Sequence, residues 1–256
     1  MVSLLKLRRP FVVGVVVEPT VARSREISAS AFREGADAVE LNLASLRSGE
    51  APRRGFFAGL RHPVYTSCRR AKFMGVYGAR FASVPVLSDE ERMERQLDWL
   101  SAGSAGLDIE ADTFAATRDE WTKTRDAVRG QRAIADATHR GRGAVIFSWH
   151  PPRTVKFPEA HRAALELRAR GADFVKIVVR VRDAREALDA AHISLQLRDA
   201  LDFPFVFLPI GPGAESVRPY MTAFGAAYLL ARPSRGSNRL PAQPLVPRAR
   251  ALVDLA

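Results

Sequence analysis

The stretch Gly171-Ala-Asp-Phe-Val-Lys-Ile-Val-Val-Arg180 has the pattern of a strand that is buried on both faces, with Lys176 at its centre. Such strands are continuous runs of apolar residues, so a cation in the middle needs either a charged partner or a chemical role. Burial disfavours the ammonium form and would leave an amine able to attack a ketone as a Schiff-base nucleophile. Taken alone, the segment fits a lysine that extends to the strand end even better.

Similar apolar runs recur along the whole chain. Besides the lysine strand, strands are predicted over residues 11–17, 38–43, 63–68, 106–109, 144–149, 203–208 and 226–230. Helices are predicted over residues 28–35, 53–61, 89–100, 117–140, 158–170 and 183–201, with a break near His192 in the last. Eight β-then-α units of about 32 residues each favour a closed parallel barrel. The predicted fold is an α/β protein, a (β/α)8 TIM barrel that forms a single domain over residues 1–256.

Composition places the chain among globular proteins of a reducing compartment. Of its 256 residues 47% are apolar, enough for a large core, and the single cysteine, Cys68, leaves no disulfide pair. The N-terminal residues do not form a secretory signal, and no long apolar run predicts a membrane span. We therefore expect a cytoplasmic protein that holds no structural metal and uses no cofactor.

The basic composition raises the question of nucleic-acid or membrane binding. Lys and Arg number 39 against 28 Asp and Glu, which gives a formal net charge of +11. These cations are scattered, with no long basic run and no interleaved aromatic motif, so a solvated basic surface is favoured over a nucleic-acid site. The expected partner is a small anionic carboxylate substrate, which a positive field attracts. A homodimer is left open beside a monomer.

Polar residues stand where predicted strands end, which is where barrels of this class carry their chemistry. Glu40 and Asn42 share one face of the second strand, because side chains alternate with a period of two. His150 follows the fifth strand, and a histidine titrates near neutral pH, as a general acid or base should. A histidine that only caps the strand is the alternative. Residues 232–244 are rich in Pro, Gly and Ser and are expected to form a loop over the site.

Five short segments carry the clearest motifs of the chain. They are Gly35-Ala-Asp-Ala-Val-Glu-Leu41, Pro63-Val-Tyr-Thr-Ser-Cys-Arg-Arg-Ala-Lys72, Gly106-Leu-Asp-Ile-Glu110, Val145-Ile-Phe-Ser-Trp-His150 and Gly171-Ala-Asp-Phe-Val-Lys-Ile177. In this order they resemble the type I 3-dehydroquinate dehydratase family, over nearly the whole chain. Each match is short, and together they are fairly specific.

The resemblance implies a (β/α)8 barrel lyase that dehydrates 3-dehydroquinate to 3-dehydroshikimate in the shikimate pathway. Carried over to this chain, it implies that Lys176 forms an imine with the substrate ketone and that His150 acts as the general acid/base. The residues themselves suit these roles, because an iminium acidifies the adjacent C–H bond and a histidine can take the proton.

The resemblance also implies a set of substrate contacts. Glu40 and Arg69 match residues that contact substrate hydroxyls and help to orient the histidine. Arg218 matches the arginine that holds the substrate carboxylate, and a planar, permanently charged guanidinium suits that task. Gln243 matches the glutamine of the closing loop, and Asn42 is expected beside Glu40 at the barrel mouth.

The chain departs from the family pattern at four positions. Asn42 stands where the family has arginine, and Phe73 stands where it has glutamate. Val217 precedes Arg218 in place of a serine, and Arg239 takes the position of a loop serine. The chain is therefore expected to be a diverged member with a less polar pocket, into which dehydroquinate fits less well.

Three functions are open at this stage. The first is the dehydratase reaction, and the second is other Schiff-base chemistry in a diverged barrel, such as aldol cleavage. The third is a non-catalytic barrel that binds an anionic ligand. The presence of both Lys176 and His150 favours an enzyme, because a binding protein needs neither a buried amine nor a proton shuttle.

Overall fold

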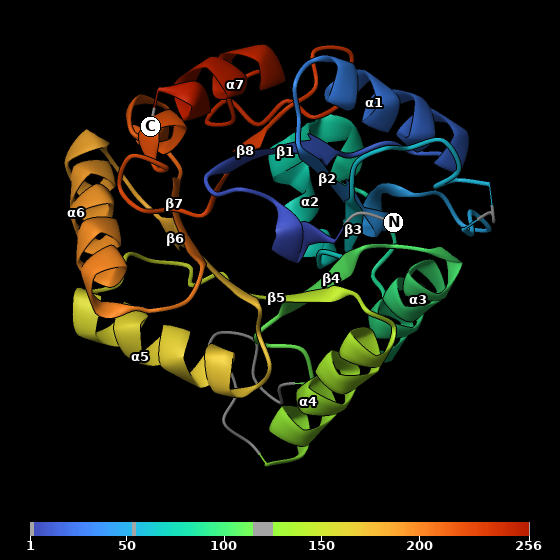
Figure 1. Cartoon of the computed structure of the whole chain (residues 1–256), viewed down its shortest axis with the longest axis horizontal. Coiled ribbons are helices and arrows are strands. Elements are labelled where there is room, and N and C mark those ends of the chain that lie inside the picture. Colours follow the sequence, from blue (N-terminus) through green and yellow to red (C-terminus); the bar gives the residue numbers. More distant parts are fainter. Residues whose placement is uncertain (1–2, 53–54, 115–124, 256) are drawn as a thin grey trace.

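Eight parallel strands line the centre of the molecule in the computed structural model, which describes residues 3–52, 55–114 and 125–255. The strands are β1 (Phe11–Val16), β2 (Ala38–Asn42), β3 (Val64–Ser67), β4 (Gly106–Glu110), β5 (Ala144–Trp149), β6 (Phe174–Arg180), β7 (Phe205–Ile210) and β8 (Tyr228–Ala231). Figure 1 shows them inside a ring of helices. Both faces of the sheet are therefore covered, which explains why the strand sequences are continuous apolar runs.

Neighbouring strands pair in the order β7-β6-β5-β4-β3-β2-β1-β8. The two end members of that order approach each other, because the amide of Ala227, just before β8, donates to the carbonyl of Phe205 in β7 at 2.7 Å. The sheet is a nearly closed barrel. The predicted (β/α)8 fold is confirmed.

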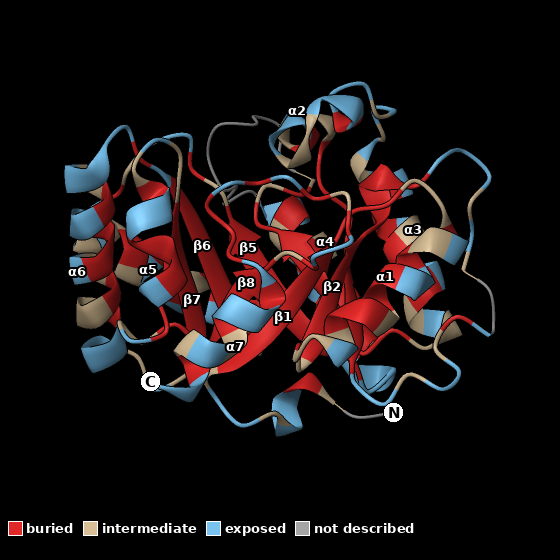
Figure 2. Ribbon diagram, turned by 90° about the horizontal axis from the view of Figure 1, so that it is seen from above, coloured by how far each residue is buried: buried red, intermediate tan, exposed pale blue. Residues whose placement is uncertain are grey.

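The barrel is surrounded by α-helices on its outer face. Those of the described residues are α1 (Val21–Arg33), α2 (Ala71–Met74), α3 (Asp89–Ala102), α4 (Arg125–Arg140), α5 (Phe157–Ala169), α6 (Ala184–Ala200) and α7 (Val246–Asp254). Figure 2 shows buried residues on the sides of these helices that face the strands and exposed residues on the opposite sides. The short helix α2 differs, because it lies over the end of the barrel. It follows β3 directly, so this is the end at which the strands finish.

Short 3-10 helices occupy several connections. They are η1 (Leu4–Lys6), η2 (Leu43–Ser45), η3 (Gly75–Tyr77), η4 (Ala79–Phe81), η5 (Ala214–Ser216) and η6 (Arg218–Tyr220). In the described residues, the connections from β2 to β3 and from β7 to β8 contain 3-10 helices in place of an α-helix. Two sides of the barrel mouth are thus built by irregular chain.

Two helices differ from the prediction, one in its start and one in its continuity. α1 begins at Val21 rather than near residue 28, because Thr20 caps it: the Thr20 hydroxyl accepts a hydrogen bond from the amide of Arg23 at 3.2 Å. α6 continues without a break through His192. Its cap, Asp183, accepts a hydrogen bond from the amide of Glu186 at 2.9 Å.

Two other predicted helices are only partly within the described residues. The helix expected over residues 53–61 does not form in its described part, residues 55–61, where Gly59 has a φ of +75° that suits a turn. The helix expected over residues 117–140 is observed as α4 from Arg125 onward. Residues 53–54 and 117–124 lie outside the described part of the chain.

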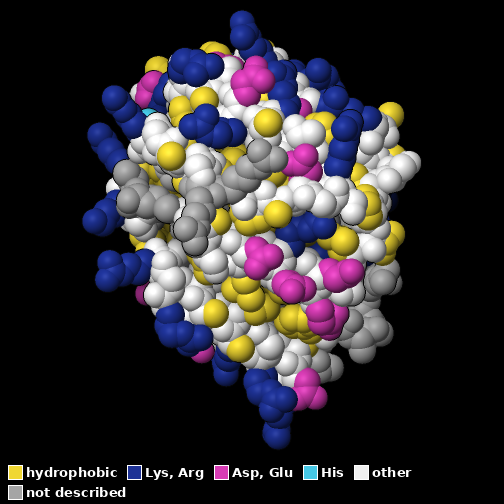
Figure 3. Space-filling model, turned by 90° about the vertical axis from the view of Figure 1, so that its right-hand side faces the viewer, with side chains coloured by type: hydrophobic (Ala, Val, Ile, Leu, Met, Phe, Trp, Pro, Cys, Tyr) yellow, Lys and Arg dark blue, Asp and Glu magenta, His cyan; other side chains and the backbone are white. Residues whose placement is uncertain are grey.

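The surface reflects the basic composition. On the face shown in Figure 3, Lys and Arg side chains are spread over much of the area, and carboxylates and uncharged surface separate them. No helix within the described ranges is long and apolar enough to cross a membrane.

Candidate active site

Polar side chains from neighbouring strands meet inside the barrel. Glu40 on β2 and Lys176 on β6 are in contact, although three strands separate them in the sheet, so both side chains point inward. Strand register places Asp108 beside Ser67 and Lys176 beside Ser148, on the same face. All five residues are buried. The strands β2 to β6 thus give the barrel a polar lining at one level.

Lys176 is an ion-paired residue. Its Nζ atom contacts Oδ2 of Asp108 and lies 3.3 Å from Oε2 of Glu40. The lysine is only 1% exposed. It is therefore not a side chain that extends to the strand end, and the charged partners that a cation in a buried strand needs are present.

Arg69, just beyond β3, joins the two carboxylates. Its Nη2 atom lies 2.6 Å from Oδ2 of Asp108 and 3.2 Å from Oε1 of Glu40. Its Nη1 atom donates to Oδ1 of Asp108 at 3.2 Å and to the hydroxyl of Ser148 at 2.9 Å. Two cations and two carboxylates therefore form one compensated network of buried side chains.

The network sets the charge of its carboxylates. Burial alone would raise the pKa of Glu40, but Lys176 and Arg69 outweigh it and lower that pKa below its usual value. Burial also tends to raise the pKa of Asp108, but Arg69 and Lys176 outweigh it and lower that pKa to about 2. Tyr65 and Ser67 add hydrogen bonds to Glu40, at 3.0 and 2.8 Å. Both carboxylates are ionised at neutral pH.

His150 lies directly above this network, as the first residue after β5. It is two residues beyond Ser148 and so points to the same side of the sheet. Burial, Arg69 and Lys176 lower the pKa of His150 well below its usual value, so the ring is neutral at neutral pH. Its Nδ1 atom lies 3.8 Å from Oε1 of Glu110, and the Phe73 ring packs against it with 5.7 Å between the ring centroids.

A cavity of about 520 Å³ opens beside His150. Its walls come from Phe73 and Val76 near α2, from the ends of β5, β6 and β7, and from residues 240–242 of the loop after β8. The lining is mostly apolar, with charge from Arg180 and Glu215. This agrees with the prediction of a less polar pocket beside Phe73. A ligand in this cavity meets His150 first, because Lys176 lies deeper in the barrel.

The remaining predicted site residues lie outside the network. Asn42 is fully buried, its Nδ2 atom lies 3.3 Å from the sulfur of Met74, and its Oδ1 atom accepts from the amide of Ala44 at 3.1 Å. It is therefore not part of the cavity wall, where the sequence placed it. Gln243 is also buried, and its Oε1 atom accepts from Nδ2 of Asn238 at 2.6 Å.

Arg218 is a buried cation in the connection after β7. Its Nη1 atom donates to the carbonyl of Pro209 at 3.1 Å, and its Nε atom has no hydrogen-bond partner within the described residues. Burial lowers the pKa of Arg218 to about 10, against the opposing effects of Tyr77 and Glu40. A guanidinium held in this way is suited to bind an anion.

The sequence interpretation did not select two carboxylates of the site, Asp108 and Glu110. Both face the barrel interior from β4, as their spacing of two residues requires. The same alternation that singled out Glu40 and Asn42 was present in Gly106-Leu-Asp-Ile-Glu110. Two acidic residues on one face of a short apolar strand were therefore the available signal.

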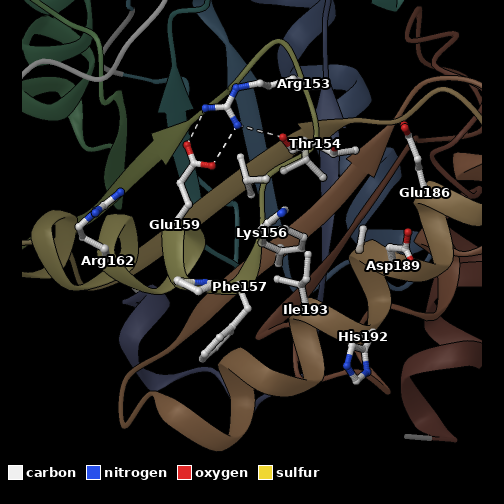
Figure 4. Close-up of a pocket in the computed structure, with 15 residues that line it drawn as sticks. Arg153, Thr154, Lys156, Phe157, Glu159, Arg162, Glu186, Asp189, His192 and Ile193 are labelled. Atoms are coloured by element: carbon white, nitrogen blue, oxygen red, sulfur yellow. Dashed lines mark hydrogen bonds and ion pairs between the residues drawn. The ribbon is translucent and has the colours of Figure 1, made fainter.

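A second, larger cavity of about 780 Å³ lies outside the barrel, between α5 and α6. Figure 4 shows Arg153 paired with Glu159 at one end and Phe157, Ile193 and His192 toward the other. None of the predicted site residues lines it. Although this cavity is the larger of the two, it is not the candidate active site.

Comparisons with known proteins agree with this geometry. The family model for type I 3-dehydroquinase matches residues 12–254. No curated protein sequence matches the chain at a significant level.

Solved structures of 3-dehydroquinate dehydratases have the same fold. The enzyme of Geobacillus kaustophilus HTA426 is 15% identical, with a TM-score of 0.75 over 99% of this chain and 95% of that one. The type I enzyme of Clostridium difficile, solved with covalently modified comenic acid, is 15% identical, with a TM-score of 0.77 over 98% and 93%. That of Enterococcus faecalis is 18% identical, with a TM-score of 0.71 over 93% and 95%.

Structural likeness at these identities shows a shared fold, whereas the family match spans nearly the whole sequence. The chain therefore belongs to the type I 3-dehydroquinase family and is a dehydroquinate dehydratase-like lyase.

Proposed function

We propose that the protein dehydrates 3-dehydroquinate to 3-dehydroshikimate through an imine on Lys176, with His150 as the general acid/base. The observation that carries this proposal is the placement of the two side chains. Among the described lysines Lys176 alone is buried, and it is paired in register with Ser148, two residues before His150. A nucleophile and a proton acceptor on adjacent strands can act on neighbouring atoms of one substrate.

The first step is imine formation. Lys176 gives up a proton, for which Glu40 and Asp108 lie in contact as acceptors, and its amine adds to the ketone carbon. The carbinolamine then loses its hydroxyl with a proton as water, which leaves an iminium. This cation withdraws electrons from the adjacent C–H bond.

The second step is elimination. The neutral ring of His150 takes the proton from the carbon next to the iminium, and an enamine forms. The enamine expels the hydroxyl group from the following carbon, and His150 returns the proton so that water leaves. Hydrolysis of the imine consumes the water released in the first step, so the overall reaction loses one water molecule.

The remaining residues bind the substrate in this proposal. Arg218 binds the carboxylate, which supplies the partner that its Nε atom lacks within the described residues. Glu40 and Arg69 contact substrate hydroxyls, and Gln243 offers an amide that Asn238 already orients. Asn42 contributes a direct contact only if its amide leaves Met74 and the amide of Ala44.

The proposal is tested by incubation with 3-dehydroquinate. A rise in ultraviolet absorbance from the conjugated enone reports turnover, and borohydride reduction should add the mass of the reduced ligand to Lys176. The variant Lys176→Ala should show neither signal. The matched control is Lys156→Ala, which removes an exposed lysine outside the barrel and should show both.

Other outcomes separate the alternative functions. Trapped mass on Lys176 without enone formation would point to other Schiff-base chemistry, such as aldol cleavage. Binding of the compound without trapped mass would point to a non-catalytic barrel. Either result contradicts the proposed reaction.

A further inference from the structure

Glu110 on β4 has one carboxylate oxygen that is well bound and one that is not. The side chain is buried, and its Oε2 atom accepts from Nη2 of Arg92 at 2.5 Å. Its Oε1 atom is also buried but has no hydrogen-bond partner within the described residues. A buried carboxylate oxygen without a donor is costly, so the site should provide one.

Three donors lie near Glu110, and two of them do not serve its Oε1 atom. Nη1 of Arg69 is 3.7 Å from Oε1, but its two N–H groups already donate to Asp108 and Ser148. Nε of Arg70 has no hydrogen-bond partner within the described residues, but it approaches Oε2, the oxygen bound by Arg92, at 3.9 Å and not Oε1. The third donor is Nδ1 of His150, at 3.8 Å from Oε1. Rotation of the imidazole ring could shorten that distance to the roughly 3 Å of a hydrogen bond.

We propose that Glu110 is a positioning residue for His150, which accepts a hydrogen bond from Nδ1–H and so leaves Nε2 as the basic atom on the side of the cavity. The carboxylate is fixed for this task. Arg92 holds it from α3 and is itself held by the carbonyl of Cys68 and by Asp89, each at 2.7 Å. The Phe73 ring limits rotation of the imidazole from another side.

The arrangement would help the histidine in two ways. A fixed Nδ1–H tautomer keeps the Nε2 lone pair free for the substrate proton. After proton transfer the imidazolium lies beside a carboxylate that compensates its charge. The catalytic consequence rests on the proposed function, but the tautomer is a property of the free protein and can be measured without substrate.

The first test uses nitrogen-15 NMR of the unmodified protein at neutral pH. The signals of His150 are assigned by their loss in His150→Gln. We expect the neutral ring with the proton on Nδ1, and a ring with the proton on Nε2 overturns the inference. If Nε2 carries the proton and the protein turns over 3-dehydroquinate, the inference about Glu110 is wrong and the proposed function stands. If Nδ1 carries the proton and the protein does not turn over 3-dehydroquinate, the inference about Glu110 holds and the proposed function is wrong.

The second test is Glu110→Gln. The amide should keep its oxygen toward Arg92 and turn its NH2 group toward His150, so that Nδ1 becomes an acceptor and the proton moves to Nε2. We expect kcat to fall about 10²-fold while KM changes by no more than a few-fold, because a misplaced base costs rate rather than binding. An unchanged His150 spectrum in this variant overturns the inference.

Two further variants complete the design. Phe73→Glu added to Glu110→Gln places a new carboxylate beside the ring and should recover part of the lost kcat. Asp173→Asn is the matched control, because Asp173 lies 3.0 Å from Nε2 of His139, at the other end of β5. It should change the His139 signals and leave those of His150 unchanged. If Glu110→Gln does not fold, the spectrum of the unmodified protein still decides.

Discussion

The barrel lining divides into two arcs of opposite character. The charged arc lies on β2 to β6 at the level of Lys176, and its inward residues there include Glu40, Ser67, Asp108, Ser148 and Lys176. The apolar arc lies on β7, β8 and β1, and its inward residues include Val206, Leu208, Leu230, Val13 and Val15. The change occurs between adjacent strands at one level, since Val206 pairs with Lys176 and Val15 pairs with Glu40.

One arc serves stability and the other serves chemistry. Apolar packing is the ordinary solution for a barrel interior, whereas a buried ion network is weak evidence for stability, because the desolvation of its members offsets their attraction. A network kept in such a place is a candidate for function. The apolar arc supports it by keeping water out, which strengthens the interactions within the charged arc.

Loss of the proton acceptor above the charged arc should have the largest effect on rate. His150→Ala should lower kcat by about 10² to 10⁴-fold, the usual contribution of a general acid/base. Imine formation, measured by borohydride trapping on Lys176, should be retained better than turnover. A variant within a few-fold of the parent rate would remove His150 from the mechanism.

Truncation of one member from each arc compares their contributions directly. Asp108→Ala leaves Arg69 and Lys176 without their shared carboxylate and should lower the free energy of unfolding by about 3–5 kcal/mol. Leu208→Ala in the apolar arc should cost about 2–5 kcal/mol through lost packing. Chemical denaturation measures both. Only the first should also abolish trapping on Lys176, and equal trapping in the two variants would contradict the division into arcs.

Acid should weaken the charged arc selectively. The pKa of Asp108 is depressed from 3.8 to about 2, so its contribution is fully present above about pH 4 and is lost as the pH falls toward 2. The shift corresponds to about 2 kcal/mol of unfolding free energy. Denaturation curves across this range should show the loss, and Asp108→Asn should flatten it. A variant with the same acid dependence as the parent would argue against this assignment.

The smallest expected effect concerns the two departures from the family pattern. We expect weak turnover of dehydroquinate by the unmodified protein, and Asn42→Arg with Phe73→Glu should raise kcat/KM by more than the sum of the single changes. A coupling of about 1 kcal/mol is typical of residues in one network. Efficient turnover by the parent, or additive effects in the double variant, would show that other residues compensate for these substitutions.

The sequence predicted the fold well because apolar strand runs and their spacing are local signals. It also singled out Lys176, since a cation inside such a run is visible in the chain itself. The partner of that lysine was not predicted, because Asp108 and Glu40 reach it across the barrel from strands far away in sequence. The surroundings of Asn42 were missed for a similar reason: Met74 reaches it only because α2 lies over the barrel end.

The balance of charge within the network has a consequence for the covalent stages of the reaction. Lys176 and Arg69 carry two positive charges, and Glu40 and Asp108 carry two negative ones. An iminium on Lys176 is a cation at the same nitrogen as the free ammonium, so the sum remains zero when substrate becomes attached. The surrounding dipoles therefore need little reorientation between free and loaded protein, which is the condition for electrostatic preorganisation. The barrel can hold each covalent stage without rearranging the side chains of the network.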